Sequence, residues 1–286
     1  MMRSLYSGVT GLRNHQTKMD VIGNNIANVN TIGYKSSRVI FQDIYSQTVK
    51  PATSASATSG GTNPQQIGLG VQVATIDVMH TKGTPQYTGY ALDLSIDGDG
   101  YFVIQNGIDQ TYTRAGNFYV DNDNYLVDAN GNFVMGIMNP APADPPVLPP
   151  APDANGHYAP GDLMKIQIDP SYTNLSIDGK GKISALDGSD TVDIGTLVVS
   201  TFANPNGLEK CGENSYRPTV NSGDPEFSAP DSAGAGKLNP GTLEMSNVDL
   251  TGEFADMIVT QRGFQANSRI ITTTDEMLEE IVNMVR

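Results

Sequence analysis

The two ends of the chain carry the spacing of large apolar residues that is typical of amphipathic helices. In the C-terminal part an apolar residue recurs at every seventh position, and further apolar residues widen the same stripe. A heptad repeat of this length predicts one long, packed helix. The repeat positions are Leu250, Met257, Phe264, Ile271, Leu278 and Val285, and Phe254, Ile258, Ile270, Ile281 and Val282 flank them.

The N-terminal end shows a shorter version of this pattern. Three glycines, Gly8, Gly11 and Gly23, interrupt it, and each lowers the stability of a helix by about 1 kcal/mol relative to alanine. Such a helix is marginal by itself. We therefore expect both ends to be disordered in an isolated subunit and helical once packed. The apolar positions are Leu5, Val9, Leu12, Met19, Ile22 and Ile26.

The C-terminal helix is too long to be covered by the rest of one subunit. A helix over 250–285 has a length of roughly 54 Å at ~1.5 Å per residue. A compact middle domain of about 190 residues has a radius of gyration of only ~16 Å. Ser246, with Asp249 three residues later, resembles a capping box at the start of this helix. The two ends therefore predict a polymerisation domain, in which they pair as in a coiled coil.

The middle of the chain has the features of a β domain. Short β-branched or aromatic runs, such as 71–76 and 101–104, alternate with turn dipeptides such as Asn106-Gly107 and Asn130-Gly131. The fold class is thus a mainly β middle with long terminal helices. We expect helical ends at 1–35 and 241–286, a linker at 36–67, a β core at 68–139 and 190–240, and a proline-rich insertion with a small β segment at 140–189.

Composition and charge exclude several functions. The 286 residues carry a net charge of −14, which argues against nucleic-acid binding. No apolar run is long enough to insert into a membrane. Cys211 is the single cysteine, so neither an internal disulfide nor a cysteine-built metal cage can form. The N-terminal 50 residues are basic and 241–286 are acidic, which lets the ends attract each other.

No catalytic, cofactor or metal site stands out. His15, His80 and His157 are widely spaced in the sequence and form no known motif. The acidic stretches 97–100 and 121–124 resemble fragments of calcium loops but lack the third ligand and the terminal glutamate. Asp and Asn in predicted hairpins usually serve the turn. We expect a protein that is not an enzyme; an exported β-rich adhesion protein that binds calcium or a glycan is the alternative outside structural proteins.

Both ends resemble the signatures of bacterial flagellar rod, hook and hook-associated proteins. The N-terminal match includes Asn24, Asn25, Ile26, Ala27, Asn28, Thr31, Gly33, Tyr34 and Lys35. The C-terminal match includes Ser246, Asn247, Val248, Gln261, Arg262, Asn267 and Ser268. The resemblance implies subunits that leave the cell through the flagellar type III export apparatus and polymerise into a helical tube.

Within this family, the stretch 60–71 and the segments 112–118 and 201–210 resemble short hook proteins. The expectation is therefore a flagellar hook subunit, part of a flexible joint outside the cell, with a distal rod subunit of the basal body as the alternative. The implied partners are copies of itself and the distal rod, hook cap and hook–filament junction proteins. On this interpretation the insertion at 140–189 is a reduced outer domain.

Overall fold

The computed structural model describes residues 2–54, 60–107, 109–139, 150, 152–153, 156–187 and 190–284. The chain divides into two compact units. The helical unit comprises Met1–Ala27, Ser36–Met79 and Val248–Arg286, and the β unit comprises Asn28–Lys35 and His80–Asn247. The expectation of helical ends around a mainly β middle is confirmed at this level. Residues 140–149 of the insertion predicted at 140–189, and Val285 of the heptad repeat, lie outside the described residues.

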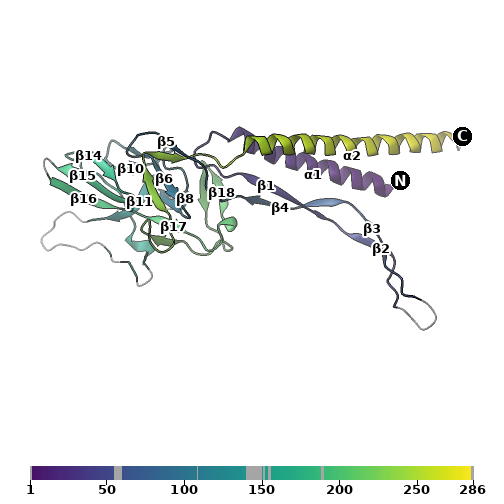
Figure 1. Cartoon of the computed structure of the whole chain (residues 1–286), viewed down its shortest axis with the longest axis horizontal. Coiled ribbons are helices and arrows are strands. Elements are labelled where there is room, and N and C mark those ends of the chain that lie inside the picture. Colours follow the sequence, from purple (N-terminus) through teal and green to yellow (C-terminus); the bar gives the residue numbers. More distant parts are fainter. Residues whose placement is uncertain are drawn as a thin grey trace. The chain divides into compact units, whose positions relative to one another are not determined.

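Two helices, α1 (Met2–Ala27) and α2 (Leu250–Met284), pair in an antiparallel manner in the helical unit (Figure 1). A Cβ atom built on Gly8 would lie 3.4 Å from Ile271, and one on Gly11 would lie 2.6 Å from the Asn267 amide nitrogen. The glycines that weaken α1 as an isolated helix thus allow α2 to approach closely. Further along, Lys18 forms an ion pair of 3.5 Å with Asp256.

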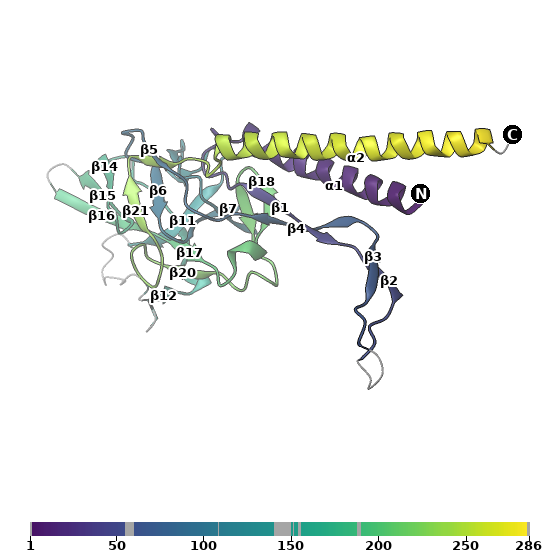
Figure 2. The same ribbon diagram turned by 45° about the vertical axis from the view of Figure 1, so that its right-hand side comes forward.

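The start of α2 differs in detail from the predicted capping box. The helix begins at Leu250, so Asp249 occupies the N-cap position, and its carboxylate accepts a hydrogen bond of 3.0 Å from the Thr251 N–H. Since the helix pair is antiparallel and Gly8 lies beside Ile271, α2 continues past the first turn of α1 (Figures 1 and 2). The last two turns of α2 therefore extend beyond the described residues of α1 (Figures 1 and 2).

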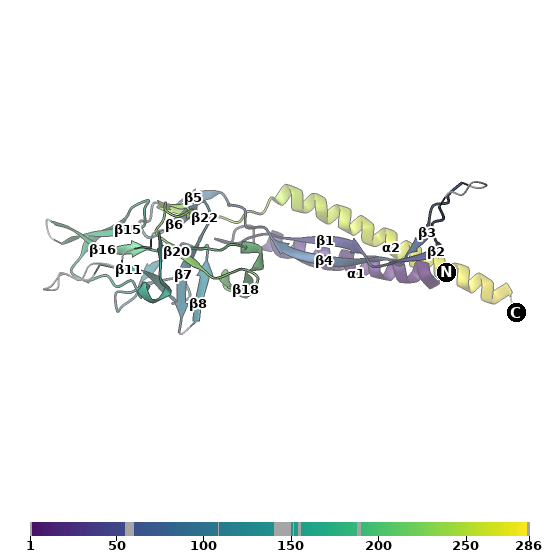
Figure 3. The same cartoon turned by 90° about the horizontal axis from the view of Figure 1, so that it is seen from below.

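The described residues of 36–79, which we name the β arm, form two antiparallel strand pairs, one enclosing the other in the sequence, where a linker was expected over 36–67. Strand β1 (Ser37–Asp43) pairs with β4 (Val71–Val78), and β2 (Ser46–Lys50) pairs with β3 (Gln65–Gly68). Val39 and Phe41 are half-buried and alternate with exposed residues, which is strand periodicity. The Asn14 amide donates a hydrogen bond of 2.6 Å to the Val71 carbonyl, and β1 and β4 run beside α1 (Figures 1 and 3).

Antiparallel strands build the β unit. Within its described residues the main sheet follows the order β12-β20-β17-β7-β11-β16-β15-β14, with β8, β9, β10, β13, β18 and β19 attached, and β5 with β22 and β6 with β21 form two smaller sheets. The strands are β5 (Pro85–Tyr87), β6 (Leu94–Asp97), β7 (Tyr101–Asn106), β8 (Asp109–Thr113), β9 (Tyr119–Val120), β10 (Leu126–Val127), β11 (Phe133–Met138), β12 (His157–Tyr158), β13 (Met164–Lys165), β14 (Thr173–Ile177), β15 (Lys182–Asp187), β16 (Asp190–Leu197), β17 (Val199–Thr201), β18 (Glu209–Gly212), β19 (Ser215–Arg217), β20 (Glu226–Ser228), β21 (Lys237–Pro240) and β22 (Thr242–Glu244). Two short 3-10 helices lie at Pro160–Asp162 and Pro205–Gly207.

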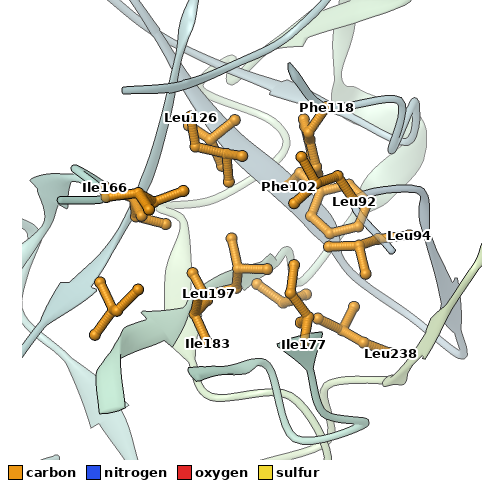
Figure 4. Close-up of a cluster of buried hydrophobic side chains, with 14 of the residues drawn as sticks. Leu92, Leu94, Phe102, Phe118, Leu126, Ile166, Ile177, Ile183, Leu197 and Leu238 are labelled. Carbon is orange, nitrogen blue, oxygen red and sulfur yellow. The ribbon is translucent and has the colours of Figure 1, made fainter. Parts of the chain in front are cut away.

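Strand β7 has a hydrophobic core on each of its faces. Phe102 and Ile104 belong to one cluster of buried side chains, and Tyr101 and Val103 belong to another. This alternation follows from the two-residue period of a strand. In the first cluster, Phe102 and Phe118 lie edge to face, with ring centroids 5.1 Å apart (Figure 4). The segment expected to stand apart at 140–189 contributes β13, β14 and β15 to this same sheet.

Candidate functional site

The N-terminal signature continues from α1 into the β unit. Residues 28–35 form successive turns in which Thr31 N–H donates to the Asn28 carbonyl at 3.2 Å and Tyr34 N–H donates to the Thr31 carbonyl at 3.4 Å. Gly33 has φ +68°, and a Cβ atom on it would lie 2.6 Å from the Ala115 backbone nitrogen. Only glycine combines this left-handed backbone with so close an approach. The signature therefore fixes a tight, buried passage of the chain.

Three buried charges meet where this passage ends. Lys35, Glu244 and Arg114 have side chains that are 0%, 1% and 2% exposed. One Glu244 carboxylate oxygen, Oε1, accepts from Lys35 Nζ at 2.6 Å and from Gly83 N–H at 2.9 Å, and Oε2 lies 3.4 Å from Arg114 Nη1. Burial lowers the pKa of Lys35, although the Glu244 carboxylate opposes that effect. Buried charges of this kind are tolerated only when they are paired.

Aromatic rings surround the cluster on the β7 side. The Arg114 guanidinium lies 5.1 Å from the centre of the Tyr101 ring, and the Tyr101 hydroxyl lies 2.6 Å from His80 Nδ1. Burial lowers the pKa of His80 to about 4, and the positive charges of Lys35, Arg114 and Lys210 act in the same direction. Burial also raises the pKa of Tyr101 to about 12. His80 is therefore a neutral ring at neutral pH.

Two further contacts hold the passage from the β18–β19 side. The Lys210 ammonium donates a hydrogen bond of 3.0 Å to the Lys35 carbonyl and lies 4.9 Å from the centre of the Tyr34 ring. The Asn214 amide donates a hydrogen bond of 2.9 Å to the Ile32 carbonyl. Asn214 itself has φ +57° in the turn between β18 and β19. The β unit thus contacts the signature from several sides.

The C-terminal signature begins in the same region. Ser246 is buried, and the Asn247 amide donates hydrogen bonds to the carbonyl and the hydroxyl of Thr81 at 3.2 and 2.9 Å. Lys35 Nζ donates to the same Thr81 carbonyl at 2.8 Å. The two signatures, which are more than 200 residues apart in sequence, therefore share one acceptor.

Asn25, near the end of α1, connects three segments of the helical unit. Its side chain exchanges two hydrogen bonds with the Ser37 backbone, at 2.8 and 3.0 Å, and donates a third to the Glu253 carboxylate at 2.8 Å. Burial raises the pKa of Glu253. Asn25 thus fastens α1, the β arm and the first turn of α2 together.

The apolar stripe of α2 divides between α1 and the surface. Met257, Phe264 and Ile271 are half-buried along the part of α2 that lies beside α1, and Leu278, further along the helix, is half-buried as well. By contrast, Phe254 and Ile258 are 51% and 59% exposed. Leu250, Ile270, Ile281 and Val282 are exposed as well, together with Val259, Met277 and Met284. The helical unit therefore presents uncovered apolar side chains along α2, to which α1 adds Tyr6 and Val9.

The remaining predicted residues differ in how far they are exposed. Leu5, Leu12, Met19 and Ile26 are half-buried on α1, Ile22 is buried, and Asn24 and Ala27 are exposed. On α2, Gln261 and Arg262 are exposed, while Asn267 and Ser268 are half-buried, as is Val248 before the helix. Sequence reasoning missed the roles of Glu244 and Arg114. The sequence offered one indication of these roles, since each charged residue lies in or directly after a short run that forms a strand.

The acidic turns have structural partners. In the stretch 97–100, Asp97 pairs with Lys82 at 2.5 Å, and in the stretch 121–124, Asp121 accepts a hydrogen bond of 2.7 Å from the Asn122 N–H. Among the described residues, no group of three or more His, Cys, Asp or Glu side chains is arranged to hold a metal ion. In the same part of the chain, no helix is long and apolar enough to span a membrane.

Three family models match the chain. Residues 5–35 match the flagella basal body rod protein model, residues 95–185 match the flagellar hook protein FlgE/F/G D1 domain, and residues 239–284 match the C-terminal model of the flagellar basal body rod FlgEFG proteins. The two terminal matches contain both signatures, and the middle match falls within the β unit.

Similar proteins are found over the full length. The chain is 50% identical over 287 residues to the flagellar basal-body rod protein FlgG of Bacillus subtilis, covering 100% of both chains. It is 34% identical to the FlgG of Caulobacter vibrioides, covering 97% of each chain. Identity to the flagellar hook protein FlgE of Borreliella burgdorferi is 31% over 440 aligned positions, with 99% of this chain covered.

The rod and hook relatives differ in how well they match the length of this chain. The rod relative agrees with the chain in length, whereas the alignment with the hook relative is far longer than the chain. The hook interpretation is therefore not confirmed, and the rod alternative has the stronger support. At the level that all these matches share, the chain belongs to the flagellar rod and hook FlgE/F/G family of structural proteins.

Proposed function

We propose that this chain is a distal rod subunit of the flagellar basal body, which polymerises with copies of itself into a helical tube that acts as a drive shaft. The observation that carries the proposal is the match to a basal-body rod protein at 50% identity over the whole length of both chains. Hook relatives match at 31% and need long gaps in the alignment.

The uncovered face of α2 supports polymerisation. Exposed apolar side chains from Phe254 to Met284 continue along the helix, and its last two turns extend beyond α1. Large exposed apolar surfaces on a subunit mark places where another protein binds. A second copy of this chain presents the same surface and can cover it. The subunits pass through the flagellar type III export apparatus before they assemble.

Electron microscopy of basal bodies from a strain that lacks this gene tests the proposal. Rods that stop before their distal end support it, and restoration by the wild-type gene is the control. Complete rods without hooks would overturn the rod assignment and restore the hook interpretation. Normal rods and hooks would overturn both. A rod subunit also predicts that the assembled structure is straight and rigid.

A further inference from the structure

The chain passes between the helical unit and the β unit four times, after Ala27, Lys35, Met79 and Asn247. Three segments of the β unit carry these passages: residues 28–35 carry two, and residues 80–84 and 243–247 carry one each. Hydrogen bonds and ion pairs between these segments decide whether the passages open one at a time or all together. All three segments meet at Glu244.

Glu244 contacts the other two segments through different atoms. Its backbone carbonyl accepts from Gly33 N–H at 2.8 Å. Its side chain accepts from Lys35 Nζ at 2.6 Å and from Gly83 N–H at 2.9 Å. The next residue donates its own N–H to the Thr84 carbonyl at 3.0 Å. One residue therefore connects segment 243–247 with both 28–35 and 80–84.

The geometry around Gly83 leaves little freedom for these contacts to shift. A Cβ atom on Gly83 would lie 1.9 Å from the Met245 carbonyl oxygen, so the two backbones are in direct contact. The Lys35 ammonium also connects segment 28–35 with segment 80–84 directly, because it donates to the Thr81 carbonyl at 2.8 Å. Arg114, at the end of β8, anchors the second carboxylate oxygen to the main sheet.

We propose that Glu244 is a clamp that makes the four passages act as a single joint. The carboxylate is 1% exposed, and its partners Lys35 and Arg114 are 0% and 2% exposed. Removing the negative charge leaves two buried cations uncompensated, and the loss then spreads to every segment that packs around them. Independent hydrogen bonds at a surface would instead open one at a time.

The clamp also determines how mechanical load is distributed over the four passages, an inference that rests on the proposed function. In a rod subunit, load on the terminal helices enters the β unit through the four passages. A single joint distributes that load over all of them. Without it, the passage under the highest tension opens first.

Native-state hydrogen exchange on the full-length subunit tests the clamp. In Glu244→Gln the acceptors of the Gly33 and Met245 amides remain chemically unchanged, because they are backbone carbonyls. We expect both amides, and Gly83, to exchange roughly tenfold faster or more, while the Val103 amide in β7 stays protected. The matched control is Glu226→Gln, at an exposed glutamate of β20, which should change none of these amides.

Two results would overturn the clamp. Acceleration of Gly83 alone would show that the contacts act separately. Loss of protection throughout β7 and β8 would show that the cluster holds the whole unit and not the passages. Lys35→Met is the second variant, since it removes a partner and retains the carboxylate, and it should accelerate the same three amides.

The consequence for force is tested separately, by counting broken rods in basal bodies from Glu244→Gln and Glu226→Gln strains. More broken rods in the first strain support it, and equal fractions overturn it. Because the exchange experiment uses the isolated subunit, its result does not depend on whether the subunit builds a rod or a hook. Failure of the clamp and failure of the proposed function are thus distinguishable.

Discussion

Gly33→Ala is the sharpest test of how the N-terminal signature works. Gly33 has φ +68°, and a Cβ atom there would lie 2.6 Å from the Ala115 nitrogen and 2.9 Å from the Arg114 carbonyl carbon. Both are backbone atoms of the β unit, so they cannot rotate away as a flexible side chain would. The matched control is Gly107→Ala, since Gly107 has φ +65° but no atom within 4 Å of a built Cβ.

The two variants share one contribution and differ in the others. A left-handed backbone lowers stability by about 1–2 kcal/mol for alanine, and this applies to both. Only Gly33→Ala adds overpacking, of about 1–3 kcal/mol. The Gly33 hydrogen bond to the Glu244 carbonyl is worth about 0.5–1.5 kcal/mol more if the segment is displaced. We therefore expect a loss of about 3–5 kcal/mol for Gly33→Ala and about 1–2 kcal/mol for the control.

Urea unfolding of the full-length subunit measures this difference. Near-ultraviolet circular dichroism of tyrosine is a suitable signal, because Tyr101, Tyr112 and Tyr216 are buried in the β unit and the sequence has no tryptophan. Equal losses in the two variants would refute the reasoning. The close approach of residues 28–35 to the β8 end would then contribute nothing, and backbone conformation alone would explain the glycine.

Other predictions concern titration, the end of α1, the surface of α2 and the state of the ends. Folding lowers the pKa of His80 from 6.5 to about 4. The free energy of unfolding of the β unit should therefore be insensitive to this group above pH 6.5 and fall as the pH is lowered from 6.5 to 4, because the unfolded chain then binds a proton that the folded one does not. His80→Gln should reduce this pH dependence in urea titrations. Asn25→Ala removes the three hydrogen bonds of the Asn25 side chain, so it should destabilise the helical unit by about 2–4 kcal/mol. The loss should lower the midpoint for polymer dissociation, whereas Gln16→Ala, at an exposed residue, should change it little. Replacing exposed Met277, Ile281 and Met284 by Gln should leave subunit unfolding within about 0.5 kcal/mol of wild type but abolish polymers in sedimentation, unlike Glu279→Gln with Glu280→Gln. Amides of α1 and α2 should exchange freely in dilute subunits and be protected in polymers; protection already present at high dilution would contradict the expected disorder.

The periodic features of the fold could be predicted from the sequence. The heptad spacing predicted both helices, and three members of the α2 repeat, Met257, Phe264 and Ile271, are half-buried. Of the strands in the β arm, the run 71–76 was expected and lies in β4, whereas β1, β2 and β3 were missed because their residues are mostly polar. Val39 and Phe41 alternate there for too few positions to stand out against Ser, Gln and Thr.

The charged cluster could not be predicted, since its members are distant in sequence. Lys35 and Glu244 are separated by 209 positions, and no local period relates them. Continuity with α1 suggested that residues 28–35 belong to the helical ends, whereas the turn at Gly33 places them in the β unit. Charge patterns describe surfaces well, but a buried ion pair depends on tertiary structure, which brings the partners together.

The four passages of the chain also affect how the subunit responds to cleavage. A protein whose two units are joined by one linker is separated by a single proteolytic cut. Here one broken peptide bond, for example between Lys35 and Ser36, leaves three covalent connections between the units. A nicked subunit would therefore keep both units attached, and gel electrophoresis under denaturing conditions would reveal damage that native sedimentation would not detect. The redundancy of the four passages therefore protects the covalent link between the units against any single cut.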